Sequence, residues 1–210
     1  MILHGYFRSA ASWRVRIALN LKRVAVQHVF HHLRRGEQRS SEYLALNPQG
    51  LVPTLAMEDG TPLTQSLAII EWLDEVHPDP PLLPGDATRR AAVRAFALIL
   101  AADTHPLQNL GVLNSLRSLG LAEAEVTRWA AEANSAGLAA CEALLAREPG
   151  PFCFGSAPSL ADLCLVPQLG NARRFNVEVG RFRQLLEREA ACMALPAFIE
   201  AAPGRQPDAE

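Results

Sequence analysis

The segment Tyr6–Asn20, YFRSAASWRVRIALN, concentrates cationic and hydroxyl side chains near the start of the chain: Arg8, Ser9, Ser12, Arg14 and Arg16. Guanidinium groups can bind carboxylates through two parallel hydrogen bonds, and the start of a helix attracts anions. A solvated helix face is the alternative for any single arginine. Arg14 and Arg16 stand two positions apart in a predicted helix, so they point to nearly opposite sides and cannot both face one site.

A second chemical signal is GLVPTL, residues 50–55. Proline lacks a backbone N–H, so Pro53 belongs at a sheet edge or in a turn rather than in a central strand. A cis Val52–Pro53 bond leaves the backbone N–H and C=O of Val52 facing outward, where they can pair with an extended peptide. The alternative is an ordinary trans proline entering a strand.

The segment LTQSLAIIEWL follows, with Gln65 and Ser66 at the predicted start of a helix. We expect Ser66 to be the N-cap of this helix, because a serine oxygen there can accept a free backbone amide. The same amides, at the positive end of the helix dipole, can hold a carboxylate. A proline edge beside an anion-binding helix start suits a small acidic peptide.

The elements that position these residues form an alternating pattern before residue 77. Short apolar runs predict strands, and Glu58-Asp59-Gly60 predicts a tight hairpin turn. The order β-α-β-β-β-α predicts a mixed sheet with a right-handed crossover near its start. The predicted strands are 2–6, 24–30, 52–57 and 61–63, and the predicted helices are 11–21 and 66–76.

The proline-rich segment HPDPPLLPGD, residues 77–86, divides the chain, because proline cannot continue a helix. Every later pattern predicts helix. Pro106 interrupts the first of these, and the spacing of Ser159 and Asp162 is typical of a capping box. The helices are expected at 89–119, 122–147, from 159 onward, 181–191 and 196–201. We therefore expect domains at 1–80 and 88–210, joined by a linker at 81–87.

Composition excludes several classes of protein. Of the 210 residues, 49% are hydrophobic and 20% charged, and the net charge of −2 argues against a nucleic-acid partner. No apolar run reaches about 18 residues, so we expect no membrane span, and the first residues lack the basic leader of a signal peptide. The four cysteines are far apart and indicate reduced cytosolic thiols, and adjacent His31 and His32 face opposite ways in a strand, so we expect no metal site.

Six segments, in this order, resemble the zeta class of cytosolic glutathione transferases, whose members include maleylacetoacetate isomerases: FRSAASWRVRIAL, ALNPQGLVPTL, TQSLAIIEWL, HPLQNLGVL, SLADLCLVPQ and RQPD. The resemblance runs from Ile2 to Asp208. It implies an α+β thioredoxin-like N-terminal domain, an all-α C-terminal domain and a cytoplasmic homodimer. The implied cofactor is glutathione, and the implied substrate is a small dicarboxylic oxo-acid.

The resemblance also assigns binding roles. Val52, preceding Pro53, pairs with the cysteinyl backbone of glutathione, Gln65 and Ser66 hold its γ-glutamyl end, and Gln38 approaches its glycine end. In the helical domain, the positions that meet glutathione or substrate are His105, Asn109, Leu110 and Gly111. His105 either lines the site or satisfies a backbone carbonyl.

The catalytic set implied by the resemblance is Ser9, Arg8 and Arg174. Ser9 has the thiol-stabilising hydroxyl, and the two arginines bind the carboxylates of the substrate. Arg173, adjacent and of the same charge, leaves the choice between 173 and 174 open. The family's Ser-Ser-Cys is Ser9-Ala10-Ala11 here, so Ala10 and Ala11 lie at the cofactor but lack polar side chains. Activities that need the cysteine are not expected.

The implied reaction is the cis–trans isomerisation of maleylacetoacetate in aromatic amino acid catabolism, with the glutathione sulfur as the nucleophile. Three alternatives stay open. They are a maleylpyruvate isomerase, a zeta-class transferase acting on α-halo acids or other electrophiles, and a non-catalytic glutathione-binding protein.

Overall fold

The computed structural model describes all 210 residues, and their contacts define two compact units. The first unit contains Met1–Leu82 together with Ala194–Glu210, and the second contains Leu83–Met193. The expected domain boundaries at 80 and 88 stay a prediction, because a division into compact units by contacts does not test where a domain begins or ends. The C-terminal segment, however, groups with the first unit and not with the helices that precede it.

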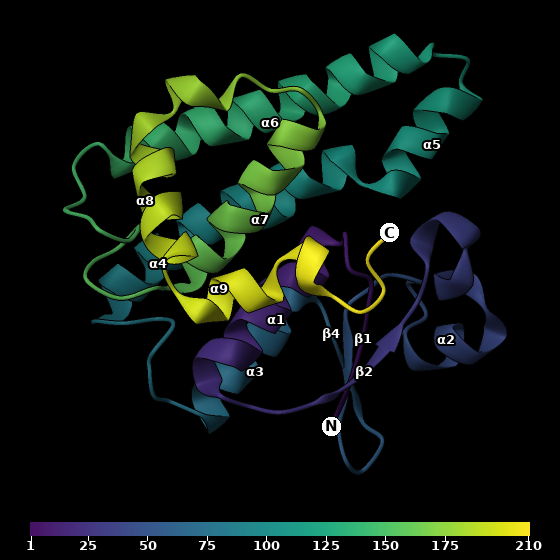
Figure 1. Cartoon of the computed structure of the whole chain (residues 1–210), viewed down its shortest axis with the longest axis horizontal. Helices are drawn as coiled ribbons and strands as arrows, with labels where there is room; N and C mark the ends of the chain where they lie inside the picture. The colour runs from purple at the N-terminus through teal and green to yellow at the C-terminus, as the bar shows by residue number, and fades with distance from the viewer. The chain divides into compact units, whose positions relative to one another are not determined.

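The reason for this grouping is the packing of two helices. Helix α9, Pro196–Ala201, packs along α1, Ala10–Lys22, as Figure 1 shows. The side-chain amide of Asn20 donates to the carbonyl of Ala197 at 3.0 Å. Phe198 and Ala201 are buried in this contact region. The last helix of the chain therefore completes the first unit.

A mixed four-stranded sheet forms the centre of the first unit. Its order is β2-β1-β3-β4; β1 and β2 are parallel, and the other pairs are antiparallel. Only part of the predicted second strand pairs, because β1 has four residues and offers no partner before Gln27. The strands are Ile2–Gly5, Gln27–Phe30, Thr54–Ala56 and Pro62–Thr64.

The predicted hairpin turn is confirmed between β3 and β4. The amide of Met57 donates to the carbonyl of Thr61 at 2.9 Å, and Asp59 Oδ1 accepts the amide of Thr61 at 2.9 Å. Gly60 has φ +85°, a left-handed conformation that glycine adopts without steric cost. This turn lies at the end of the hairpin opposite to Pro53 and Gln65.

Helix α3 spans Ser66–Val76, the range that the sequence predicts, and packs against α1. The apolar side chains of Ile17, Ile69 and Leu73 are inaccessible to solvent. A short helix, α2, covers Ser41–Leu46, between β2 and β3. The thioredoxin-like order predicted for this part of the chain is confirmed.

The second unit is built of helices, as predicted for an all-α domain. They are α4 Ala87–Leu98, α5 Leu110–Ser118, α6 Glu123–Leu145, α7 Leu160–Arg174 and α8 Arg183–Met193. The predicted helix 89–119 is interrupted over a longer segment than Pro106 alone suggests. A π-helical turn at Ile99–Thr104 and a 3₁₀ turn at His105–Gln108 separate α4 from α5. The hydroxyl of Thr104 donates to the carbonyl of Ile99 at 2.7 Å across this irregular segment.

The start of α7 contains the predicted capping interaction. Asp162 Oδ2 accepts the backbone amide of Ser159 at 2.9 Å, and Oδ1 accepts the amide of Cys153 at 2.8 Å. The hydroxyl of Ser159 also donates to the same carboxylate at 2.8 Å. Complete burial raises the pKa of Asp162 above its ordinary value.

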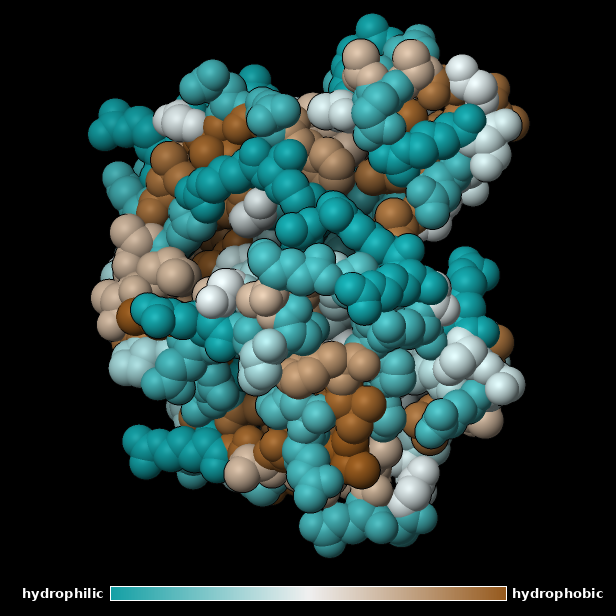
Figure 2. Space-filling view, turned by 45° about the vertical axis from the view of Figure 1, so that its right-hand side comes forward, coloured by the Kyte–Doolittle hydropathy of each residue, from teal (hydrophilic) through white to brown (hydrophobic).

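No helix of this structure is both long enough and apolar enough to cross a membrane. The face drawn in Figure 2 mixes hydrophilic and hydrophobic side chains over its whole area. All four cysteines are buried and free, and burial raises the pKa of the Cys141 thiol to about 12. The Cys141 thiol is therefore protonated at neutral pH.

Candidate active site

The turn between β1 and α1 presents a helix N-terminus and a hydroxyl. Ser9 is the N-cap of α1, and its Oγ accepts the amide of Ser12 at 3.2 Å. The backbone amides of Ala10 and Ala11 form no hydrogen bond within the chain. Because the capping bond uses only the Ser9 oxygen, its hydrogen stays available as a donor. Two amides, one hydroxyl and the helix dipole can together stabilise an anion here.

Arg8 lies beside this cap. Its guanidinium carbon is 5.2 Å from the centroid of the Phe7 ring, a cation–π arrangement. Arg8 makes no hydrogen bond or ion pair with another residue, and it is partly exposed. Its guanidinium group is therefore able to bind an external carboxylate.

The prediction that Arg14 and Arg16 point to different sides of α1 is confirmed. Arg14 Nη1 donates to the hydroxyl oxygen of Ser66 at 3.4 Å. Arg16 donates to backbone carbonyls, including that of Phe7 at 2.9 Å. Both side chains are buried. Burial lowers the pKa of Arg16 to about 10, which leaves it protonated at neutral pH.

The Val52–Pro53 bond is cis, as the first alternative predicted. The pairing of β3 with its neighbours begins only at Thr54, and neither the N–H nor the C=O of Val52 forms a hydrogen bond within the chain. Val52 itself is 8% exposed. Unpaired peptide groups in the loop that precedes a strand can pair with an added extended segment.

Two buried polar side chains, Tyr43 and Asn47, fix the loop that precedes β3. The carbonyl of Leu51 accepts the Tyr43 hydroxyl at 2.6 Å and Asn47 Nδ2 at 2.8 Å. The Tyr43 hydroxyl also contacts Thr54 Oγ1 at 2.9 Å. Sequence analysis missed these two residues; the signal was two polar groups at Tyr43 and Asn47 in an otherwise apolar run, YLALN.

The expectation that Ser66 caps α3 is wrong. Ser66 is the first helical residue, and Gln65 is the N-cap, with φ +67°. The Ser66 hydroxyl contacts Arg14 instead, whereas Gln65 Nε2 donates to Gln49 Oε1 at 2.9 Å. A non-glycine residue at positive φ costs about 1–3 kcal/mol and is concentrated at functional sites.

The first turn of α3 offers donors to an anion. The amides of Ser66, Leu67 and Ala68 form no hydrogen bond within the chain, and the turn contains no acidic residue. The buried cation Arg14 lies against Ser66, which adds positive charge behind these amides. This helix start is therefore suited to a carboxylate.

Gln38 lies in a 3₁₀ turn and is 8% exposed. Its Nε2 donates to the carbonyl of Leu33 at 3.4 Å, and its Oε1 is buried without a hydrogen-bond partner. Its role toward the glycine end of glutathione stays a prediction.

In the second unit, the predicted residues cluster at the start of α5. Asn109 is the N-cap, and its Oδ1 accepts the amide of Val112 at 3.1 Å. Leu110 and Gly111 are the first two helical residues, and Leu110 is partly exposed. The ring of His105 contacts Gln108 at 3.4 Å. The structure brings these four predicted residues into one segment, and their roles stay predictions.

Arg173 and Arg174 end α7 and differ in their partners. Arg173 donates two hydrogen bonds to the carboxylate of Glu189, which raises the pKa of the guanidinium. The guanidinium carbon of Arg174 lies 4.8 Å from the centroid of the Phe175 ring. Phe175 packs in turn against a buried cluster that includes Leu113 of α5. This chain of contacts orients Arg174.

A thioredoxin-like unit with a cis-proline directly before β3, together with a helical unit, is the architecture of cytosolic glutathione transferases. Comparison with known families agrees with this. The profile of the glutathione S-transferase N-terminal domain matches residues 8–76, and that of the C-terminal domain matches residues 123–201.

Relatives that match this chain over its full length narrow the family to a class of isomerases. A protein named probable maleylacetoacetate isomerase from Vibrio cholerae is 45% identical, over 100% of this chain and 98% of its own length. A protein named maleylpyruvate isomerase from a Ralstonia species is 47% identical, over 99% of both chains.

Solved structures agree. The holo structure of a maleylpyruvate isomerase, described as a bacterial zeta-class glutathione S-transferase, superposes with a TM-score of 0.97 at 45% identity and covers 100% of both chains. A maleylacetoacetate isomerase from Methylobacterium extorquens AM1, with bound malonate and glutathione, gives 0.96 at 40% identity and 100% of both chains. The chain therefore belongs to the glutathione S-transferase family, in the zeta class of maleylacetoacetate and maleylpyruvate isomerases.

Proposed function

We propose that this chain catalyses the glutathione-dependent cis–trans isomerisation of maleylacetoacetate to its fumaryl product in aromatic amino acid catabolism. The observation that carries the proposal is the cap of α1. There the Ser9 oxygen binds Ser12, while the Ser9 hydrogen and the amides of Ala10 and Ala11 remain available to an anion. Bound glutathione supplies a thiolate whose reversible addition to the C=C bond permits rotation.

The first unit has the groups that glutathione requires. The unpaired peptide groups of Val52, before cis-Pro53, fit a cysteinyl backbone. The amides at the start of α3, with Ser66 and Gln65, fit the γ-glutamyl carboxylate. Gln38 is assigned to the glycine end by the resemblance alone.

Ser9 holds the sulfur in its charged state. A free thiol is mostly protonated at neutral pH, so the site has to favour the anion. The Ser9 hydroxyl donates to it, and the α1 dipole contributes about 0.3–1 kcal/mol when exposed and more when partly buried. Backbone amides do not depend on side-chain type, so Ala10 and Ala11 preserve this function without the family's serine and cysteine.

Arg8 and Arg174 bind the carboxylates of the substrate. Their planar guanidinium groups match a carboxylate with two hydrogen bonds and stabilise the negative charge that develops next to it. Arg174 matches the family arginine at the substrate pocket, and Glu189 engages the guanidinium group of Arg173. The resemblance assigns a further set to positions that meet glutathione or substrate: His105, Asn109, Leu110 and Gly111.

Maleylpyruvate is the second candidate substrate, because the 47% identical Ralstonia relative is named for that reaction. The shorter diacid needs the same two arginines. A comparison of kcat/KM for the two maleyl acids distinguishes them, since the better substrate is the one whose carboxylates both reach a guanidinium group.

We further propose that the protein is a cytoplasmic homodimer. Four free, buried cysteines and a thiol cofactor suit a reducing compartment. The homodimer is what the resemblance to the zeta class implies. Light scattering that gives a particle of 22.8 kDa, the mass of one chain, would overturn the dimer, and cell fractionation tests the compartment.

Proton NMR of the reaction tests the function. An isomerase converts the cis vinyl signals into trans signals while the concentration of glutathione stays constant. A stoichiometric loss of glutathione, with a stable thioether as product, would instead identify a transferase. No change in either set of signals would identify a non-catalytic binding protein.

A further inference from the structure

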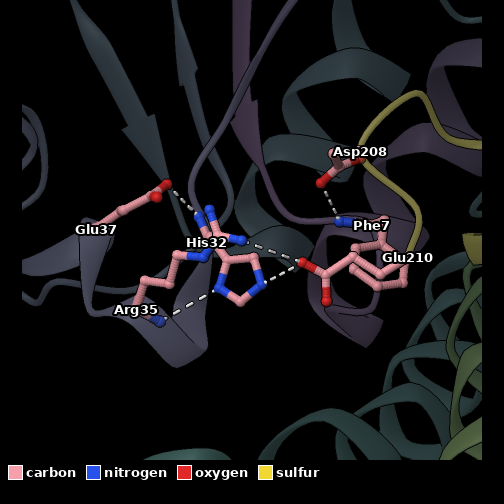
Figure 3. Close-up of polar contacts among 6 residues, drawn as sticks. All are labelled: Phe7, His32, Arg35, Glu37, Asp208 and Glu210. Atoms are coloured by element: carbon pink, nitrogen blue, oxygen red, sulfur yellow. Dashed lines mark hydrogen bonds and ion pairs between the residues drawn. The ribbon is translucent and has the colours of Figure 1, made fainter.

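The C-terminal tail, residues 203–210, contacts the turn that contains Arg8 and Ser9. Asp208 Oδ2 accepts the backbone N–H of Phe7 at 2.9 Å, a contact drawn in Figure 3. The carbonyl of Phe7 accepts Arg16 Nη2 at 2.9 Å. Both peptide groups of the residue before Arg8 are therefore held by side chains from outside the turn.

Arg16 connects this turn to the base of the tail. Its Nε donates to the carbonyl of Ala201, at the end of α9, at 3.0 Å, and its Nη1 donates to the carbonyl of Tyr6 at 3.4 Å. Burial lowers the pKa of Arg16, and the negative charge of Asp208 opposes that effect. The buried Arg16 thus has carbonyl acceptors in the turn and at the end of α9. The compensating negative charge, that of Asp208, lies on the tail.

The tail has two further attachments. Gln206 Nε2 donates to the carbonyls of Glu200 and Ala202, at 2.8 and 3.1 Å, which folds the tail back on α9. At the other end, Glu210 Oε1 contacts His32 Nε2 at 2.7 Å. Figure 3 shows Asp208 directed at Phe7 and Glu210 directed at His32. The tail is consequently fixed on both sides of Asp208.

We infer that Asp208 is a positioning residue: its carboxylate fixes Phe7, and through Phe7 the placement of Arg8 and Ser9. This inference rests on the proposed function, in which those two residues meet substrate and sulfur. The turn between β1 and α1 consists only of residues 6–9. Few rotatable backbone bonds therefore separate Phe7 from Arg8 and Ser9, so a shift of Phe7 also displaces these two residues. Displacing a reacting group by about 1 Å can cost about 100-fold in rate.

The test compares Asp208→Ala with Asp208→Asn in the full chain. Asparagine keeps an oxygen that accepts the Phe7 amide, loses the charge and places an NH2 group at the buried position of Oδ1. The matched control is Asp59→Ala, because Asp59 also accepts a backbone amide in the first unit, that of Thr61 at 2.9 Å, in the turn far from Pro53. Three quantities are measured: kcat/KM, the pKa of the glutathione thiol in the complex by thiolate absorbance, and hydrogen exchange at residues 7–9.

We expect Asp208→Ala to lower kcat/KM by about 10-fold to 100-fold. The thiol pKa should rise and exchange at residues 7–9 should accelerate, while Asp208→Asn stays near the wild type and Asp59→Ala does not differ from it. The thiol pKa does not depend on the fraction of folded enzyme, so partial misfolding does not imitate the effect.

Wild-type values for Asp208→Ala in all three measurements would overturn the inference. Equal impairment of Asp208→Asn and Asp208→Ala would also overturn it, because charge rather than the Phe7 hydrogen bond would then be responsible. A wild type that binds glutathione without isomerising a maleyl acid refutes the proposed function alone, since the thiol pKa still tests Asp208. Hydrogen exchange tests Asp208 without glutathione.

Discussion

Two guanidinium nitrogens of Arg173 donate to the two carboxylate oxygens of Glu189, and the adjacent Arg174 instead lies over the ring of Phe175. Sequence alone gives these arginines the same charge and neighbourhood. The ion pair engages the Arg173 fork. Our proposal that Arg174 binds the substrate carboxylate rests on the resemblance, and the following variants test it.

Replacing Arg174 by lysine should raise KM for the maleyl substrate by about 10-fold, because a point charge cannot reproduce two parallel hydrogen bonds. Arg173→Lys is the control and should leave KM nearly unchanged. Steady-state kinetics of both variants measure this. The opposite result, with only Arg173→Lys affecting KM, would reverse the assignment.

Ser9→Ala should lower kcat and raise the pKa of the bound thiol, since a donor to the sulfur is lost. The same change removes the cap of α1 and should reduce the free energy of unfolding by about 1 kcal/mol. Ser9→Thr keeps the hydroxyl and serves as the control for both effects. A Ser9→Ala enzyme with wild-type kcat would mean that the helix amides alone stabilise the thiolate.

Tyr43→Phe should weaken glutathione binding and leave substrate binding by Arg8 and Arg174 unchanged. The lost hydroxyl binds the carbonyl of Leu51 and contacts Thr54, so the loop that presents Val52 loses one of its supports. We expect KM for glutathione to rise several-fold and stability to fall by about 1 kcal/mol. Calorimetric titration with glutathione measures the effect, and an unchanged dissociation constant would contradict it.

Stability should fall between neutral and mildly acidic pH because of His4 and His31. Their ring nitrogens are 2.9 Å apart, and burial is the main cause that lowers the pKa of each. Below the ordinary value of about 6.5, the unfolded chain binds protons that the folded chain does not, so unfolding becomes easier as pH falls through that window.

Thermal unfolding at pH 7.5 and 5.5 measures this dependence, and His31→Gln is the informative variant. Glutamine cannot titrate but can still hydrogen-bond to His4, so the difference in Tm between the two pH values should be smaller than in the wild type. An equal difference in both proteins would show that other groups cause the acid sensitivity.

Local chemistry explains what the sequence could predict. The glycine turn at residue 60 and the bounds of α3 follow from side-chain type and short-range spacing. The sequence left a cis and a trans Pro53 both open, and the structure has the cis bond. The N-cap of α3 did not follow from the local sequence. Gln65 has its positive φ while its side chain contacts Gln49, and the hydroxyl of Ser66 contacts Arg14 of another helix. Local propensity contains no information on such contacts.

The tail shows the same limit at a longer range. Phe7 and Asp208 are separated by 201 positions, and RQPD resembles a family segment without revealing its partner. Compactness groups Ala194–Glu210 with the sheet, whereas the sequence prediction placed these residues in the helical domain 88–210. Tertiary packing, not periodicity, determines this arrangement.

The central claim is that the glutathione sulfur, held at the N-terminus of α1, makes the double bond of the substrate rotatable. The most direct measurement is the rate at which the maleylacetoacetate absorbance is lost, with enzyme present, as the concentration of glutathione is increased from zero. The account predicts no loss above the uncatalysed rate without glutathione and a saturable increase with it. An enzyme-dependent rate that is the same with and without glutathione would contradict it.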